Sequence, residues 1–193
     1  NSSGPEAPHP GSATGIGPVK DWERISWLEA EPCAAARERE HMAEVAPGLS
    51  WQEGPGGGWE GAAPVWPFQR ERPAKLDEFT EGRELQLKIE YPQSYPMAEP
   101  LFVPVKPAPP LVLRSWSQWH VLPNGGLCLL QEAVTWNGTY TAADLVPKAS
   151  GWYLEFLLVE KGLIEGMTMN GIASDDHLDH FFEEPQSWTY DEL

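Results

Sequence analysis

The sequence predicts a single α+β domain, with a helix first, a meander of antiparallel strands next and further helices last. Three observations support this order: apolar residues at helical spacing near both ends, strict polar–apolar alternation over residues 84–91, and strong turn signals between these segments. The 193 residues suffice for one domain with a hydrophobic core. We expect a flexible Pro-, Gly- and Ser-rich tail over residues 1–18, the domain over 19–170 and an acidic C-terminal extension over 171–193.

The first helical region is expected over residues 21–46. Its apolar residues, from Trp22 to Met42, follow a loose helical spacing. Pro32 lies inside this region, and a proline removes a backbone donor from a helix. The region therefore forms either one kinked helix or two helices that break at Pro32.

A hairpin and a series of strands should follow. The glycine-rich turn 54–58 lies between Trp51 and Trp59, which predicts a hairpin. Residues 84–91 form a half-buried antiparallel strand, whose apolar face would contain Leu85, Leu87, Ile89 and Tyr91. The β-rich run 100–107 contains prolines and so fits an edge strand or a short strand, and residues 109–121 form a further β-rich run.

A second helix should begin after Thr141. Thr141 and Asp144 have the spacing of a capping box, and Pro147 comes early, where a helix tolerates it better. The residues that continue the helical period are Leu145, Ala149, Trp152, Tyr153, Phe156, Leu157 and Leu163. The acidic C-terminal stretch predicts a short helix and a tail, docked by Phe181, Phe182 and Trp188.

Composition narrows the possible functions. Thirteen basic and 29 acidic residues give a net charge of −16, which disfavours binding to a nucleic-acid backbone. The sequence has no apolar run of about eighteen residues and no secretory leader, so we expect no membrane contact. The two cysteines are far apart, which fits a reducing cytoplasm better than a disulfide framework.

Cys128 is the candidate for chemistry. It follows the Asn124-Gly125-Gly126 turn, which leaves the backbone open just before the thiol. His120, Asn124 and backbone amides could surround an oxyanion there. A cysteine among leucines is also often a small core residue, so both interpretations stand; Cys33 is expected to be such a packed residue.

Three motifs stand in order around Cys128. Pairs of Tyr or Glu with Pro occur at residues 91–92, 95–96 and 99–100, the stretch Gly125-Gly126-Leu127-Cys128 follows, and Trp136 comes after it. This order resembles the ubiquitin-conjugating enzyme family, and the resemblance covers residues 21–166. It implies the ubiquitin-conjugating-enzyme-like fold, with a catalytic-cysteine loop after the sheet, and a thioester formed on Cys128.

One position departs from the family pattern. Where the family has the Asn of its His-Pro-Asn stretch, this chain has His120. Such a replacement resembles divergent bacterial members from anti-phage operons, the cyclic-oligonucleotide-based signalling systems (CBASS). The resemblance implies that His120 replaces the Asn as an oxyanion donor or acts as a base, with support from Asn124, Gly125 and Trp136.

The same resemblance implies the partners. Cys128 would accept the C-terminal carboxyl of a protein modifier, in these systems a cGAS-like nucleotidyltransferase, and pass it to a lysine on a target. The sequence has no phosphate-binding Gly-x-x-x-x-Gly-Lys motif, so we expect an activating enzyme or a pre-activated donor. We expect no cofactor and no metal.

Other interpretations remain open. The protein could be a non-catalytic binding module of the same fold, or a cysteine hydrolase with His120 or His41 as the base. Glu132 and Asp144 could assist the attacking amine, although a loop carboxylate and a helix cap are the preferred interpretations. His177 and His180 have a spacing that could bind a metal, but a solvated tail is preferred.

Overall fold

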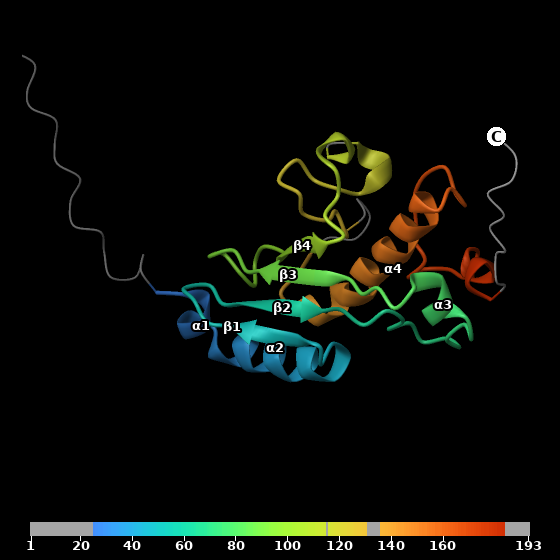
Figure 1. Cartoon of the computed structure of the whole chain (residues 1–193). Coiled ribbons are helices and arrows are strands. Elements are labelled where there is room, and N and C mark those ends of the chain that lie inside the picture. The colour runs from blue at the N-terminus through green and yellow to red at the C-terminus, as the bar shows by residue number, and fades with distance from the viewer. Residues whose placement is uncertain (1–24, 115, 131–135, 184–193) are drawn as a thin grey trace, which may run out of the picture.

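Two short helical segments open the part of the chain that the structure describes. The structure is a computed structural model, and it describes residues 25–114, 116–130 and 136–183 (Figure 1). Helix α1 spans Trp27–Ala30 and helix α2 spans Pro32–Val45. The chain therefore breaks at Pro32 instead of kinking, because a proline is well suited to the first turn of a new helix. The predicted tail 1–18, Trp22, Glu132 and Trp188 lie outside the described residues.

The glycine-rich turn forms the predicted hairpin. Strands β1 (Leu49–Gln52) and β2 (Gly58–Ala62) are antiparallel, with Trp51 opposite Trp59 and their ring centroids 5.2 Å apart. Gly57 has a φ of +62°, and a Cβ there would lie 2.1 Å from the Trp51 ring. Only glycine suits this position, since the backbone is left-handed and the indole fills the space of a side chain.

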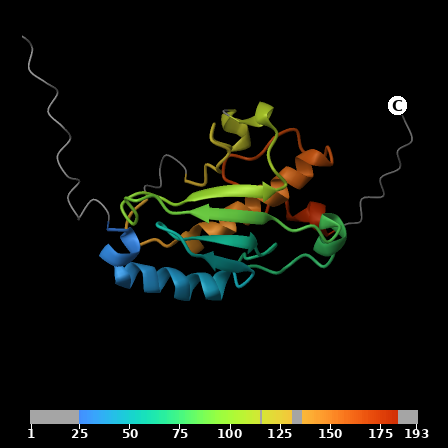
Figure 2. The ribbon, with the colours of Figure 1, turned by 60° about the vertical axis from the view of Figure 1, so that its left-hand side comes forward.

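The next two strands extend the hairpin into a four-stranded antiparallel sheet. Strands β3 (Gln86–Glu90) and β4 (Leu101–Lys106) extend the hairpin in the order β1-β2-β3-β4 (Figures 1 and 2). The alternation predicted around β3 is confirmed, since Leu87 and Ile89 are buried and Lys88 is exposed. The expected edge position of the proline-containing run is also confirmed: β4 is the last strand in the order.

The further β-rich run predicted over 109–121 is wrong. Its described residues, 109–114 and 116–121, form two 3₁₀ helices, η2 (Leu111–Leu113) and η3 (Ser117–Trp119), and an isolated bridge from Val121 to Leu127 in place of a strand. Leu111 is 77% and Val112 67% exposed, whereas Trp119 and Val121 are buried, so only the end of this run reaches the core. The prolines that precede it supply no backbone N–H for a strand ladder.

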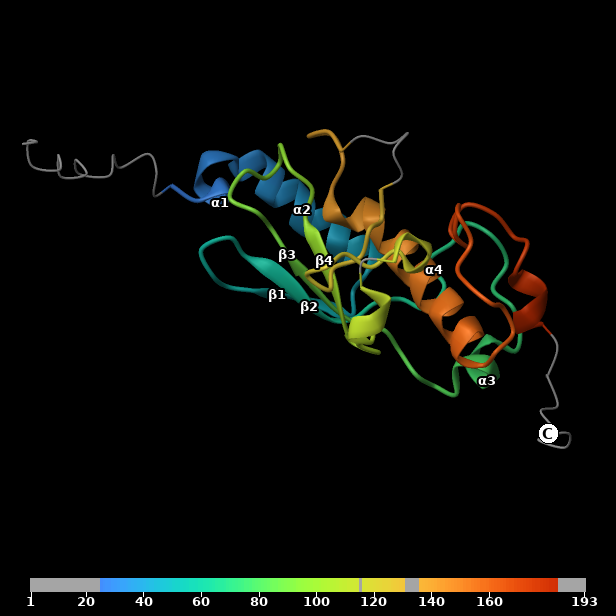
Figure 3. The ribbon, with the colours of Figure 1, turned by 90° about the horizontal axis from the view of Figure 1, so that it is seen from above.

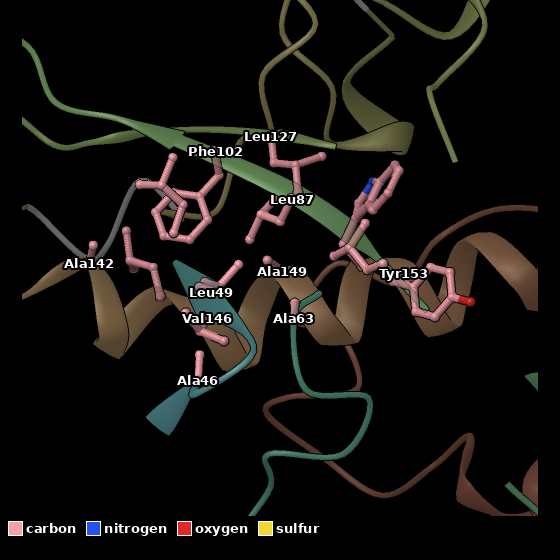
Figure 4. Close-up of a cluster of buried hydrophobic side chains, with 14 of the residues drawn as sticks. Ala46, Leu49, Ala63, Leu87, Phe102, Leu127, Ala142, Val146, Ala149 and Tyr153 are labelled. Carbon is pink, nitrogen blue, oxygen red and sulfur yellow. The ribbon is translucent and has the colours of Figure 1, made fainter. Parts of the chain in front are cut away.

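Helix α4 (Ala142–Glu160) covers one face of the sheet, and a shorter helix, α3 (Leu76–Thr80), precedes β3. Figure 4 shows Ala142 and Ala149 on the side of α4 that faces Phe102 and Leu87, and Val146 beside Leu49 and Ala46. The predicted capping box is present, with the Thr141 N–H donating to Asp144 Oδ2 at 2.7 Å. The helix ends at Glu160, so Leu163 lies in the following turn and not, as predicted, on the helix.

A buried carboxylate joins α2 to the start of α4, where the two helices meet (Figure 3). Glu38 is completely buried and accepts hydrogen bonds from the Tyr91 hydroxyl at 2.8 Å, from the Tyr95 hydroxyl, and from the Ala142 N–H at 3.0 and 3.1 Å. Loss of solvent raises the pKa of Glu38 above its ordinary value, and the hydrogen bonds from Tyr95 and Tyr91 oppose this rise. Both tyrosines of the Tyr-Pro pairs therefore serve this buried network.

The segment after α4 returns to the domain. Phe182 lies in a short 3₁₀ helix, η4 (Asp179–Phe182), and its ring packs edge-on against Phe79 of α3; both Ile172 and Phe182 are buried. Figure 2 shows this red segment beside α3. Arg70 holds this segment through two bonds to Asp179, of 2.6 and 2.8 Å, and one of 2.8 Å to the Ile172 carbonyl. The predicted docking by Phe182 is confirmed, and residues 171–183 contribute to the core of the domain.

The helices of the described residues are too short or too polar to cross a lipid bilayer. The longest of them, α4, contains Asp144, Lys148 and Glu155 within its span.

Candidate functional site

Cys128 lies on a tight loop that is tied to the edge of the sheet. Its N–H donates to the His120 carbonyl at 2.8 Å, and the Leu122 N–H donates to the Gly126 carbonyl at 2.7 Å. The Leu127 N–H donates to the Phe102 carbonyl of β4, also at 2.8 Å. These bonds fix the backbone at Cys128 while its side chain remains exposed. The core-residue interpretation of Cys128 is therefore wrong.

The turn before Cys128 has strict backbone requirements. Gly125 has a φ of +86°, and a Cβ on Gly126 would lie 2.3 Å from Leu101 Cδ1. Asn124 closes the turn, since its Oδ1 accepts the Gly126 N–H at 2.9 Å. Asn124 and Gly125 thus shape the turn before Cys128, but they do not line the pocket beside the thiol.

That pocket brings together three stretches of the chain that are far apart in sequence. His120, Cys128 and Leu129 form one side, and the face of α4 from Lys148 to Glu155 forms the second. Residues 167–173, which follow α4, form the third side. Cys128 and His120, the two candidate catalytic residues, therefore line one pocket.

His120 is held in an unusual backbone conformation. Its φ is +51°, in the left-handed region that histidine enters more readily than most residues with a side chain. Its Nε2 lies 3.1 Å from the Thr168 carbonyl oxygen. A carbonyl only accepts, so Nε2 carries the proton, and Nδ1 of the neutral ring keeps a lone pair without a hydrogen-bond partner among the described residues.

Glu155 is one of the pocket residues, with Lys148 and Thr168, that the sequence did not point to. Its side chain lines the pocket but is only 1% exposed. Its two oxygens accept hydrogen bonds from the Thr168 N–H at 2.6 Å, the Thr168 hydroxyl at 2.8 Å and the Ile172 N–H at 2.9 Å. The signal was a carboxylate inside the apolar run of α4, where an ionised group is stable only when hydrogen-bonded.

The thiol itself is not paired with the imidazole. Cys128 Sγ makes a long hydrogen bond, of 3.8 Å, to the Leu130 carbonyl. Lys148 lines the same pocket from α4 and brings a positive charge to it. The geometry thus supplies an accessible thiol, a nearby ring with a free lone pair and a cation.

The other residues singled out from the sequence lie elsewhere. Trp136 is buried and donates from Nε1 to the Pro96 carbonyl at 2.8 Å, away from the pocket lining. His41 contacts the Thr141 hydroxyl at 2.7 Å and is not brought to Cys128. Asp144 completes the capping box of α4, whose N-cap is Thr141. Cys33 is exposed at the start of α2, so its expected packing was wrong: the first turn of α2 turns this position to solvent.

His177 and His180 make local contacts. His177 pairs with Asp175 at 3.1 Å, and His180 Nδ1 lies 2.9 Å from the His177 carbonyl. Within the described ranges, no three His, Cys, Asp or Glu side chains gather closely enough to hold a metal ion.

No known family's model, no curated protein and no solved structure matches this chain. The geometry of the pocket and the motifs around Cys128 are therefore the features that bear on function.

Proposed function

We propose that the protein is a thioester-forming acyltransferase of the ubiquitin-conjugating type, with Cys128 as its acyl-carrying residue. The observation that supports this most is the exposed thiol of Cys128, held by backbone bonds to His120 and to β4, on a pocket that it shares with His120. A fixed, accessible thiol is what a nucleophilic cysteine requires.

The order of elements is consistent with this proposal. A helix, an antiparallel meander, a loop with the cysteine and a long covering helix follow one another along the chain. This order is the one implied by the resemblance to ubiquitin-conjugating enzymes, and the assignment of that fold is part of the proposal.

The reaction runs in two acyl transfers. The Cys128 thiolate attacks the activated C-terminal carbonyl of the modifier, expels the leaving group and forms a thioester. A lysine amine of the target then attacks this thioester, forms the amide bond and releases Cys128 as a thiolate. One proton must leave the attacking amine during the second step.

His120 acts in the second step as a base. Its Nε2–H is already directed at the Thr168 carbonyl, so this donor is not free for an oxyanion. The Nδ1 lone pair remains to take the proton of the amine. Of the two roles that the sequence allowed for His120, the base therefore has the stronger support.

The partners follow from the same chemistry. The donor is a protein with an activated C-terminus, in the anti-phage setting a cGAS-like nucleotidyltransferase, delivered by an activating enzyme or already activated. The acceptor is a lysine of a target protein, and the reaction takes place in the bacterial cytoplasm without a cofactor.

Intact-protein mass spectrometry tests the proposal. The chain is co-expressed with the products of its neighbouring genes as wild type, Cys128→Ser, Cys128→Ala and Cys33→Ser; Cys33 is the other exposed thiol and provides the matched control. We expect a thiol-labile adduct on the wild type and on Cys33→Ser, a thiol-stable ester on Cys128→Ser, and no adduct on Cys128→Ala. An absence of adducts in every combination, together with full cellular function of Cys128→Ala, contradicts the proposal.

The fate of the loaded chain separates conjugation from hydrolysis. Purified thioester is mixed with a lysine-bearing acceptor or with buffer alone. We expect amide formation to depend on the amine, and His120→Ala to slow this step by about a hundredfold, in the range for general acid–base catalysis. His120→Asn, which also tolerates the left-handed backbone, controls for a change in loop shape. Equal loss of the thioester with and without amine identifies a hydrolase instead.

A further inference from the structure

We propose that Glu155 is a positioning residue that sets the orientation and the proton of the His120 ring through Thr168. The consequence of this role for catalysis rests on the proposed function.

The Glu155 carboxylate is hydrogen-bonded to the segment that follows α4. The carboxylate accepts the Thr168 N–H, the Thr168 hydroxyl and the Ile172 N–H at 2.6 to 2.9 Å. The Thr168 hydroxyl in turn accepts the Gly171 N–H at 3.0 Å. One side chain of α4 therefore satisfies both ends of the turn 168–172, and its burial strengthens each bond.

The same turn contacts the His120 ring. The Thr168 carbonyl oxygen is 3.1 Å from His120 Nε2. Because Glu155 holds the N–H and the hydroxyl of the same residue, the carbonyl of Thr168 has little freedom to turn away. The ring of His120 thus has a fixed acceptor on one side, and its Nδ1 is left as the free base.

Close packing keeps the turn against the helix. A Cβ on Gly151 would lie 3.1 Å from the Ala173 N atom, so the absence of a side chain at Gly151 lets the segment after Ile172 approach α4. Gly151 and Glu155 lie on successive turns of one face of α4. The position of the pocket wall is therefore set by α4.

Isosteric substitutions test the link. Glu155→Gln keeps the volume but directs an NH₂ group at one of the N–H groups that the carboxylate accepts. Thr168→Val removes only the hydroxyl, and Thr168→Ser restores it. Glu38→Gln is the matched control, because Glu38 is likewise a buried glutamate that contacts α4, but at the opposite end of the helix and outside the pocket.

The first readout is independent of acyl transfer. In the full-length chain labelled with ¹⁵N-histidine, the His120 ring is assigned from its loss in His120→Asn. We expect a protected Nε2–H signal in the wild type and in Glu38→Gln. We expect the exchange of this proton with water to be at least about tenfold faster in Glu155→Gln and Thr168→Val, and Thr168→Ser to restore protection, since a hydrogen-bonded ring proton exchanges only on opening.

The second readout is the transfer step. We expect Glu155→Gln to lower kcat for aminolysis about tenfold, with the KM for the amine within about twofold, because a misdirected base affects the transition state more than binding. Glu38→Gln should retain the kcat of the wild type.

The outcomes separate this inference from the proposed function. An unchanged His120 ring signal in both Glu155→Gln and Thr168→Val overturns the positioning role, whether or not the protein transfers acyl groups. Faster ring exchange in these variants, without any thioester on the wild type, supports the positioning role while the proposed function fails. If Glu155→Gln does not fold, Thr168→Val and its Thr168→Ser partner carry the test.

Discussion

His120 and Gly125 show at the level of single residues how the loop around Cys128 is built. Both have a left-handed backbone, with φ values of +51° and +86°. Such a conformation costs a residue with a side chain about 1 kcal/mol, and it persists at sites where the surrounding bonds enforce it. Here those bonds run from Cys128 to His120 and from Gly126 to Asn124.

Gly125→Ala should therefore disturb the thiol as well as the stability. We expect a loss of about 1–2 kcal/mol in the free energy of unfolding, from the left-handed backbone, and a changed rate of Cys128 alkylation. Gly82→Ala is the control: its φ is +67° and nothing lies within 4 Å of an added Cβ. It should lose similar stability in urea unfolding and leave Cys128 alkylation unchanged. Equal alkylation rates in all three proteins contradict this prediction.

Tyr153 presents the opposite case, a polar group without a bond. Its hydroxyl is buried and has no hydrogen-bond partner among the described residues, and burial raises its pKa to about 12. We expect Tyr153→Phe to raise the free energy of unfolding by about 1 kcal/mol, because it removes an unsatisfied buried hydroxyl. Urea unfolding measures this. Tyr91→Phe, which removes a donor to Glu38, should lower the stability instead.

The sequence indicated some of these residues and missed others. Cys128, His120 and the turn at Gly125 could be found because each stands in a local motif. Glu155 could not be linked to His120 from the sequence, because the link passes through the Thr168 carbonyl. Every residue has a backbone carbonyl, so such a contact does not require a particular residue type. The exposure of Cys33 was missed because α2 is too weakly amphipathic to reveal which face is buried.

At the level of elements, the segment from Gly171 to Glu183 depends on one arginine. The Arg70 guanidinium lies over the rings of Trp66 and Phe68, at 4.9 and 4.7 Å, and makes a two-fold contact with Asp179. The bond to the Ile172 carbonyl completes its contacts. A planar guanidinium is required for this combination, because a lysine ammonium can neither stack on an aromatic ring nor bind both oxygens of a carboxylate through two parallel N–H groups.

Arg70→Lys should therefore be far from conservative. We expect a loss of about 2 kcal/mol in the free energy of unfolding and faster backbone hydrogen exchange over residues 171–182. Arg72→Lys is the control, because Arg72 also contacts a carboxylate, that of Asp77, but on the exposed surface. That change should stay within about 0.5 kcal/mol. Similar losses in both variants contradict the role assigned to Arg70.

Elements with a clear period were predictable, and the irregular loop was not. The hairpin, β3 and the start of α4 followed from turn residues, alternation and a capping box. The run 109–121 was mistaken for a strand because its apolar residues suggest burial, whereas prolines and exposure at Leu111 and Val112 leave it as short 3₁₀ turns. The apolar residue Leu163 extended the helical period past the actual end of α4.

At the level of the whole molecule, Glu38 connects the layers. It joins α2, the chain after β3 and the first turn of α4 through Tyr91, Tyr95 and the Ala142 N–H. Because burial raises its pKa above 4.5, the folded protein holds this proton more tightly than the unfolded chain does. The contribution of Glu38 to stability is thus fully present below pH 4.5 and is lost as the pH rises through the raised pKa.

Glu38→Gln should remove this pH dependence. The quantity to measure is the free energy of unfolding of the wild type minus that of the variant, from urea titrations between about pH 4 and pH 8. We expect this difference to fall as the pH rises, by at most about 1.4 kcal/mol per pH unit, since one proton is involved. The other carboxylates are the same in both proteins, so their contributions to the pH dependence cancel in this difference. A difference that rises with pH contradicts the prediction.

The overall arrangement was accessible from the sequence only in outline. The α+β class and the order of helix, sheet, loop and helix followed from local patterns. The pocket did not, because it depends on long-range contacts between the loop at Cys128, the middle of α4 and residues 167–173. Local patterns specify elements, whereas the way in which distant segments meet depends on packing of the whole core.

The pocket's three-part construction has a consequence for biosynthesis. The ribosome makes the chain from its N-terminus, so Cys128 emerges before α4 and well before Thr168 and Ile172. During that interval the thiol is present but the wall of its pocket is not. The nascent chain thus lacks a completed pocket beside Cys128. Under the proposed function, we expect Cys128 to accept its acyl group only after residues 167–173 have left the ribosome and packed against α4.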